Sequence, residues 1–263
     1  MGTLSGCNIK TTELATAKKT ISVSLIGGLG NWMFMIGAGL TIADRTGRNF
    51  VMRPYMVQGY HHDMKLHCDK IQSFFVTRES EPVCIIKENA AGETCESIVH
   101  RISTKDDDHV VILGFFQRPE FLHTFLHNII PPSVELPHYF IHVRRGDYVG
   151  LNLLLPLIYY EKSMKFFSGV PLIFSNDPHW CQEQVIFKGG IISSTRNSLQ
   201  ILAEMKSCQG GICANSSLSY IGAWLQNRTH RICMPGRWWS EDVSHNRPSW
   251  ATIIHFNKTA ALV

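Results

Sequence analysis

Four side chains that could do chemistry stand together near the middle of the chain: His142, Arg144, Arg145 and Asp147. They follow the apolar run Tyr139–Ile141, which predicts a buried strand. Ligands of open α/β sheets bind beyond the carboxyl ends of strands, and paired guanidinium groups suit a diphosphate there. Asp147 could orient an arginine, accept a hydrogen bond from a base or sugar, or act as a general base. A surface turn held by an Arg–Asp pair is the alternative without a function.

A glycine-rich turn near the start is a second candidate site, with Gly27, Gly28 and Gly30 just ahead of Asn31. Glycines let the backbone approach a ligand closely, and the following helix would present free N–H groups to an anion. The turn is not a dinucleotide fingerprint, because Met33 occupies the third glycine position, and it is not a Walker loop. Asn31 is a polar candidate in an otherwise apolar segment, and a plain tight turn is the alternative.

Two more polar turns precede predicted helices. Ser175–Asp177 ends an apolar strand, and Ser216 and Ser217 begin an apolar helix. The second helix would offer another N-terminal site for an anion. Ordinary helix capping explains both turns equally well.

The elements that must position these side chains alternate along the chain. Strands are predicted at Ile21–Ile26, Val110–Phe116, Tyr139–Val143, Leu172–Ser175 and Gly211–Ala214. Helices are predicted at Trp32–Arg45, Leu157–Phe167, His179–Val185, Ser198–Ser207 and Ser217–Gln226. This alternation predicts an α/β fold with a largely parallel sheet. The stretch Val51–Asp108 is less periodic and is assigned only to the remainder of the first half.

Pro131 and Pro132 interrupt the pattern where a linker between two α/β halves would fall. We therefore expect a poorly ordered segment at 1–19, an N-terminal α/β half at 20–135 and a C-terminal α/β half at 136–263.

The composition sets limits on the class of protein. The chain has 263 residues, of which 44% are hydrophobic and 17% charged, and this excludes a disordered, collagen-like or coiled-coil chain. A net charge of +4 suits an anionic ligand in a local pocket better than a nucleic acid on a broad basic face. Ile21–Ala43 contains no charged residue, but its glycines favour a strand–turn–helix over a membrane span.

The cysteines and the N-terminus indicate different compartments. The eight cysteines are Cys7, Cys68, Cys84, Cys95, Cys181, Cys208, Cys213 and Cys233. No two have CxxC spacing, so disulfides in a secretory lumen are one interpretation and buried thiols in a cytosolic enzyme the other. Cys84/Cys95 and Cys208/Cys213 are the short-loop candidates for disulfides. The first nineteen residues, however, lack the apolar core of a signal peptide.

The motifs together resemble the α-1,2-fucosyltransferases of glycosyltransferase family eleven. The chain has GGLGN, HVRRGDY, FSNDPHWC and NSSLSYIGAWL followed by PGRWW, in that family's order, from Ile21 to about Trp239. The resemblance implies a GT-B-type fold, with two Rossmann-like halves facing a cleft and the acceptor on the side of the first half. It also implies inverting, metal-independent transfer of L-fucose from GDP-fucose to the 2-hydroxyl of a terminal β-galactoside on a glycan. The partners implied are GDP-fucose and that glycan, with no cofactor.

By this resemblance the second half holds GDP-fucose. Arg144 and Arg145 would grip the phosphates with help from Ser216 and Ser217, and His142 would lie near the guanine or its ribose. Fixed arginines and helix N-termini can stabilise a leaving diphosphate as a metal ion does.

The resemblance also suggests how the first half contributes. Asn31 would reach across the cleft from the loop of Gly28 and Gly30 towards phosphate or sugar. Asn31, Arg145 and Asp147 are therefore the catalytic candidates, with Asp147 the first choice for the base that inversion requires.

The chain departs from the family pattern at several positions. Trp32 replaces the usual glutamine after the glycine turn, and the expected aromatic residues are missing at Leu218 and Ile221. No acidic residue precedes Glu204 in its helix. These differences keep a second hypothesis open, a non-catalytic module that binds a glycan or GDP.

A metal-dependent GT-A glycosyltransferase is the third hypothesis, because Asp106–Asp108 contains a D-x-D sequence. Those aspartates precede the predicted strand Val110–Phe116 rather than follow it, which favours a solvated turn. His61–Asp63 with His67 and Cys68 has suitable ligand types, but its spacing matches no standard metal site. We expect no metal.

The family's animal members suggest a location. The expectation is the Golgi lumen, with membrane association only through an anchor not present in this chain. Sequons at Asn227 and Asn257 would carry glycans, whereas Asn215 lies inside the implied donor site.

Overall fold

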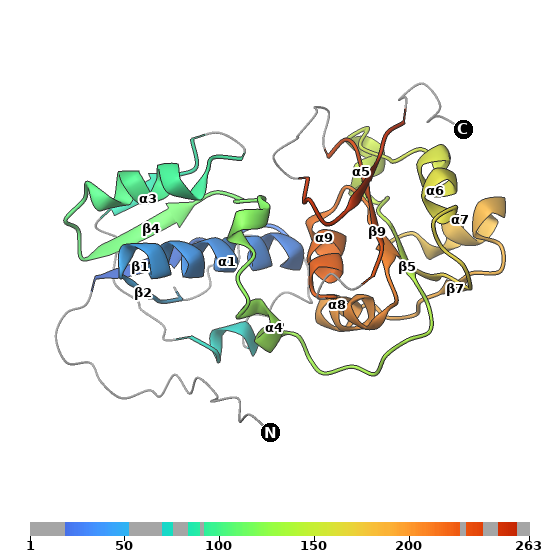
Figure 1. Ribbon diagram of the computed structural model, residues 1–263, viewed down its shortest axis with the longest axis horizontal. Coiled ribbons are helices and arrows are strands. Elements are labelled where there is room, and N and C mark those ends of the chain that lie inside the picture. Colours follow the sequence, from blue (N-terminus) through green and yellow to red (C-terminus); the bar gives the residue numbers. More distant parts are fainter. Residues whose placement is uncertain are drawn as a thin grey trace.

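The chain folds into two parallel β-sheets that lie side by side (Figure 1). The computed structural model describes residues 19–52, 70–75, 84–89, 92–226, 230–238 and 247–256. In the first sheet the strands are β1 (Thr20–Val23), β2 (Asn49–Phe50), β3 (Cys84–Lys87) and β4 (His109–Leu113), in the order β2-β1-β4-β3. The predicted α/β class with parallel sheets is confirmed.

The second sheet has the order β10-β9-β8-β5-β6-β7, and every neighbouring pair is parallel. Its strands are β5 (Phe140–Val143), β6 (Leu172–Ser175), β7 (Ile191–Ile192), β8 (Gly211–Ile212), β9 (Ile232–Pro235) and β10 (Thr252–Ile254). All strands of the first sheet lie within 20–135 and all strands of the second within 136–263. The domain boundaries themselves remain a prediction.

The charge-free segment Ile21–Ala43 is divided between β1, a glycine turn and helix α1 (Leu29–Thr46). Gly47, at φ 65°, ends the helix in the left-handed conformation that glycine adopts without strain. Within the described residues, no helix has both the length and the apolar character needed to cross a membrane.

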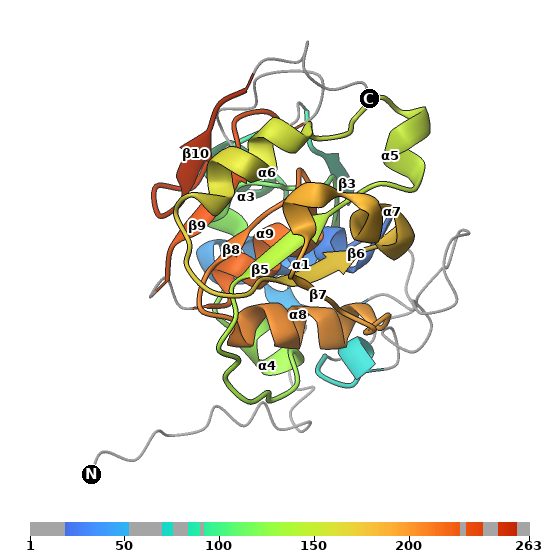
Figure 2. The same cartoon turned by 90° about the vertical axis from the view of Figure 1, so that its right-hand side faces the viewer.

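Helices cover both faces of the second sheet (Figure 2). Helices α6 (Leu157–Met164) and α7 (Pro178–Glu183) pack on the face of Ile141 and Ile173. Helices α8 (Ser198–Ser207) and α9 (Ser217–Trp224) pack on the face of Phe140 and Phe174. Other helices among the described residues are α3 (Cys95–Ser103), α4 (Leu126–Ile129), α5 (Asp147–Gly150) and the short 3-10 turns η1 (Pro119–Phe121) and η2 (Val185–Phe187).

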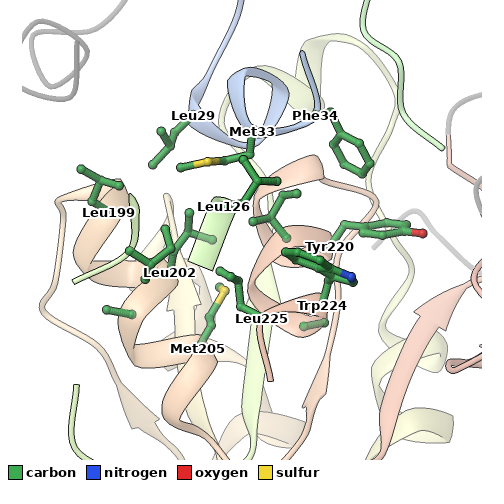
Figure 3. Packing of buried hydrophobic residues seen from close by; sticks show 14 of the residues in the cluster. Leu29, Met33, Phe34, Leu126, Leu199, Leu202, Met205, Tyr220, Trp224 and Leu225 are labelled. Carbon is green, nitrogen blue, oxygen red and sulfur yellow. The ribbon is translucent and has the colours of Figure 1, made fainter. Parts of the chain in front are cut away.

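One hydrophobic core joins the two halves. The first turns of α1 place Leu29, Met33 and Phe34 against α8 and α9, as Figure 3 shows. Phe34 meets Tyr220 of α9 edge-on, with ring centres 5.2 Å apart. The other face of α1 packs on β1 and α3 in the core of the first half. Helix α1 therefore belongs to both cores and fixes the halves against each other.

Several predicted elements differ from those observed. The predicted strands Ile21–Ile26, Val110–Phe116 and Gly211–Ala214 end earlier, at Val23, Leu113 and Ile212, because turns that carry polar or glycine residues begin there. The helices predicted at Leu157–Phe167 and Ser217–Gln226 also end earlier, at Met164 and Trp224. The less periodic stretch Val51–Asp108 contains both β3 and α3.

The expected disulfides do not form among the described residues. Cys84, Cys95, Cys208 and Cys213 are free thiols, as are the other two described cysteines, and all but Cys84 are buried. Cys213 donates its S–H to the carbonyl of Ser219 at 3.3 Å, within the helical packing of the second half. Burial as a small hydrophobic residue, rather than cross-linking, accounts for these positions. Cys7 and Cys68 lie outside the described residues.

Candidate active site

The candidate side chains gather at the carboxyl edge of the second sheet. Strand β5 lies between β8 and β6, so the turns that follow these three strands are neighbours. Val143, the last residue of β5, pairs with Ser175, the last of β6. The turn of Arg144 and Arg145 therefore stands between the turn of Asp177 and the start of α9.

Arg145 is held by the turn that follows β6. Its backbone N–H donates to Asn176 Oδ1 at 2.8 Å, and its Nε donates to Asp177 Oδ2 at 3.1 Å. The guanidinium carbon lies 3.9 Å from the ring centre of Trp180, a cation–π contact. Asp177 also caps α7 by accepting from the Trp180 backbone N–H at 3.2 Å. The capping interpretation of this turn is thus right, and the same carboxylate also orients Arg145.

Arg144 is paired with Asp147 at 2.7 Å, and both side chains are partly exposed. Gly146 lies between them at φ 46°, in the region where glycine is unstrained, and the Asn176 amide occupies the place of a Cβ. Because Asp147 already binds Arg144, its carboxylate orients an arginine in this structure.

His142, in strand β5 just before the two arginines, is buried, with 5% of its surface exposed. Burial, assisted by the charge of Arg144, lowers the pKa of His142 to about 3. The imidazole is therefore neutral at pH 7, and its Nδ1 has no hydrogen-bond partner among the described residues. A neutral ring can accept or donate a hydrogen bond to a base or sugar, but it adds no charge to a phosphate site.

The turn before α9 is anchored to its neighbours through Asn215, which is 4% exposed. Its side-chain amide donates to the Leu153 carbonyl at 2.8 Å, and its own carbonyl accepts from Tyr148 Oη at 3.0 Å. Ser216 makes no side-chain capping bond to α9. Ser217 instead donates its hydroxyl proton to Asn31 Oδ1 at 2.6 Å, across the boundary between the halves.

The glycine turn meets α9 directly. At Gly30 a Cβ would overlap the backbone nitrogen of Leu218, so this glycine allows two helix N-termini to touch. At Gly28 no other described residue beyond its chain neighbours comes within 4 Å of the place that a Cβ would take. Gly30 thus serves helix packing, and Gly28 leaves open space at the N-terminus of α1.

Asn31 is the centre of a hydrogen-bond chain that the sequence did not predict. Its Oδ1 also accepts from Gln117 Nε2 at 2.9 Å, and Gln117 Oε1 accepts from Trp238 Nε1 at 3.0 Å. Gln117 follows β4 of the first sheet, and Trp238 follows β9 of the second. The structure therefore joins Asn31 and Ser217, as the prediction of a site between the halves requires, and adds two residues to it.

The metal candidates do not form a site in the described part of the chain. Asp106–Asp108 precedes β4 at the amino edge of the first sheet, where Asp106 pairs with Lys19 and the Asp107 carbonyl accepts from Arg48. Among the described residues no cluster of three potential metal ligands occurs. His61–Asp63, His67 and Cys68 lie outside the described residues, as do the sequons at Asn227 and Asn257.

In this structure the carboxyl edges of the two sheets face each other across the boundary between the halves. This arrangement defines the GT-B class of glycosyltransferase folds. The solved structure of the Escherichia coli heptosyltransferase WaaC with ADP has this fold. It matches with a TM-score of 0.52 over 92% of this chain and 94% of that chain, at 8% identity. The GT-B prediction is confirmed, and the GT-A hypothesis is wrong.

Sequence comparison then shows which family the second half is similar to. Residues 133–253 match the family Glycosyl transferase family 11, which confirms the resemblance inferred from the motifs. The α-1,2-colitosyltransferase of Escherichia coli is 25% identical over 268 residues, covering 82% of this chain and 91% of that protein. The O-antigen biosynthesis glycosyltransferase WbnK of the same organism is 28% identical over 114 residues, 38% of each protein. Residues 133–253, most of the second half of the chain, are thus similar to family 11 glycosyltransferases.

These relatives do not support the expected Golgi location. Both are Escherichia coli proteins. The disulfides that argued for a lumen are absent among the described cysteines. The relatives and the described thiols therefore give no support to a location in the Golgi lumen.

Proposed function

We propose that the protein transfers L-fucose from GDP-fucose to the 2-hydroxyl of a terminal β-galactoside on a glycan, with inversion and without a metal ion. The observation that carries this proposal is the pair Arg144 and Arg145 at the carboxyl end of β5, within a GT-B fold. A nucleotide diphosphate leaving group needs fixed positive charge, and two guanidinium groups supply it.

Arg145 is the principal phosphate ligand in this proposal. Its Nε donates to Asp177 and one face of its guanidinium group lies over the Trp180 ring, so the guanidinium plane is fixed before any substrate arrives. Its two terminal amino groups make no hydrogen bond within the described residues and can receive a diphosphate as a fork. Preorganised donors stabilise charge that develops on the leaving group without having to reorient.

Arg144 is the second phosphate ligand, and Asp147 holds it ready. The Arg144–Asp147 pair is partly exposed, so exchange of this carboxylate for a phosphate requires little desolvation. We assign Asp147 the role of orienting Arg144, which its ion pair supports. The Asp147 carboxylate becomes available as a general base only if the substrate binds Arg144 in its place.

His142 and the two serines complete the donor site. We assign the neutral His142 imidazole to the guanine or its ribose, where an uncharged hydrogen-bonding group is suitable. Ser216 is a candidate phosphate ligand. The Ser217 hydroxyl donates its hydrogen bond to Asn31, so in this arrangement it contributes to the site through Asn31 or as an acceptor for a sugar hydroxyl, and not as a donor to phosphate.

Asn31 approaches the donor from the first half, beside Gly28. We propose that its amide contacts the diphosphate or the sugar, at the boundary where transfer would occur. The acceptor then binds on the side of the first half.

The donor sugar has two candidates. One relative carries the name α-1,2-colitosyltransferase, so colitose is the alternative donor sugar. The test is turnover of GDP-fucose and GDP-colitose with a panel of β-galactoside acceptors, with and without EDTA. Transfer that persists in EDTA supports the proposal, and loss of activity in EDTA contradicts its metal independence.

Replacement of Arg145 by alanine tests the phosphate role. Loss of the guanidinium should weaken GDP binding by about 10-fold to 100-fold, because a hydrogen bond to a charged group contributes roughly 1.5–3 kcal/mol. Isothermal titration with GDP measures this change. Arg145→Lys keeps the charge and should recover only part of the affinity, whereas Arg101→Ala, in the first half, is the control. Unchanged GDP affinity in Arg145→Ala would overturn the assignment.

A GDP-binding protein without transferase activity is the second candidate. The observation that favours it is that Trp32 and Leu218 depart from the family pattern at the boundary between the halves. GDP binding without turnover of either sugar donor on any acceptor would select this candidate.

A further inference from the structure

The hydrogen-bond chain at Asn31 has a fixed polarity. An indole N–H can only donate, so the contact of Trp238 Nε1 at 3.0 Å requires the oxygen of Gln117 to face it. The amino group of Gln117 must then face Asn31, to which it donates at 2.9 Å. Asn31 Oδ1 is therefore the acceptor, and Ser217 adds a second donor to the same oxygen.

This polarity determines what Asn31 can offer to a ligand. With Oδ1 held by two donors, Nδ2 points the other way, to Gly27, where a Cβ would lie 2.6 Å from it. Nδ2 makes no hydrogen bond to any described residue. Asn31 thus presents two N–H donors and no acceptor at the glycine turn.

Gln117 is held in place by a strained turn. Phe116, the residue before it, has φ 50°, a conformation rare for a side chain of this kind. Glu88 accepts from the backbone N–H groups of Phe115 and Phe116 at 2.9 and 3.2 Å, and Phe116 packs edge-on against Phe121. Strain of this kind persists where the surroundings fix it, often beside a functional group.

We propose that Gln117, oriented by Trp238, is a positioning residue that keeps Asn31 turned so that only its amide N–H groups face the donor sugar phosphate. This inference rests on the proposed function. The N–H groups would stabilise negative charge on the departing diphosphate, and a reversed amide would present a repelling oxygen there.

Gln117→Glu is the direct test, because the two side chains have the same shape. The carboxylate still accepts from Trp238 but cannot donate to Asn31, so Asn31 turns its amino group to Glu and its oxygen to the substrate. We expect kcat to fall about 10-fold to 100-fold, since misplaced donors to developing charge act on the transition state. The Kd of GDP should rise as kcat falls, because free GDP carries the charge that develops on the leaving group, whereas the KM of the sugar donor should change less than kcat. A merely structural role would change stability and KM instead.

The tryptophan provides a matched pair of variants. Trp238 and Trp250 both meet the ring of Tyr220 edge-on, at 5.8 Å and 82°. Only Trp238 reaches Gln117. Trp238→Phe should lower kcat, and Trp250→Phe, with the same loss of an indole, should leave it unchanged.

A double-mutant cycle closes the test. Because Trp238 acts through Gln117, Trp238→Phe should cause no further loss of kcat in the Gln117→Glu background. Independent losses that multiply, or a Gln117→Glu enzyme with wild-type kcat, would overturn the inference while the proposed function stands. Absence of turnover by the wild-type enzyme on either sugar donor would refute the proposed function and this inference with it.

Discussion

The buried imidazole of His142 links the candidate site to the stability of the fold. Its pKa is about 3 in the folded chain and about 6.5 in an unfolded one. The unfolded state therefore binds a proton more readily, and acid favours unfolding. The stabilisation is complete above about pH 6.5 and is lost as the pH falls from there towards 3.

Replacement of His142 by phenylalanine should remove this pH dependence. Between pH 6.5 and pH 4, the wild-type protein should lose roughly 3 kcal/mol of unfolding free energy that the variant does not lose. Urea denaturation at a series of pH values measures both curves. Parallel curves for the two proteins would show that folding does not lower the pKa of His142.

The arginines could be predicted from sequence as residues, but their partners could not. Arg144 and Arg145 follow an apolar strand, and a strand's carboxyl end is where ligands bind. The capping role of Asp177 was visible, whereas its bond to Arg145 depends on β5 and β6 being neighbours with ends in register. No feature of the sequence around Gln117 predicts a role for it, because its partners Asn31 and Trp238 lie on two other turns.

At the scale of elements, the crossing of α1 and α9 depends on Gly30. A methyl group there would overlap backbone atoms of Ser217 and Leu218, which cannot move aside as a side-chain end can. We expect Gly30→Ala to destabilise the protein by about 1–3 kcal/mol through overpacking. Chemical denaturation measures the loss.

Gly28→Ala is the matched control, two residues earlier. Gly28 has φ −84° and ψ 173°, which alanine adopts freely, and its Cβ position is open. Its unfolding free energy should stay within about 1 kcal/mol of the wild-type value. Equal losses in the two variants would mean that close helix contact is not what Gly30 provides.

The sequence predicted long, regular elements better than short or edge elements. The bounds predicted for β6 and α8 are those observed, because an apolar run and a capped apolar helix both give strong signals. β2 and β7 have two residues each, too few for any periodic pattern. α3 did carry a signal that was missed: Thr94 caps it, and Cys95, Ile98 and Ile102 form its buried stripe.

At the scale of the whole molecule, the shared core predicts that the halves unfold together. Phe34 of α1 lies against Tyr220 of α9, so removing its ring opens a cavity at the boundary. Phe34→Ala should cost about 3–5 kcal/mol and lower one common transition. Differential scanning calorimetry should give equal calorimetric and van't Hoff enthalpies.

Phe166→Ala provides the comparison, because that ring is 45% exposed and lies outside the shared core. Its transition temperature should stay close to that of the wild type. Two separate transitions in the wild-type protein, with only one of them lowered by Phe34→Ala, would contradict a single cooperative unit.

Burial of the free thiols determines how readily they react with oxidants. Burial raises the pKa of the Cys208 and Cys233 thiols to about 12, and it also raises the pKa of Cys181 and Cys213. The thiolate is the form that reacts with peroxides and disulfides, so these sulfurs are chemically inert while the fold is intact. Their resistance to oxidation comes from packing and would hold in a reducing or an oxidising environment alike. The buried cysteines among the described residues thus serve as small hydrophobic residues of the core.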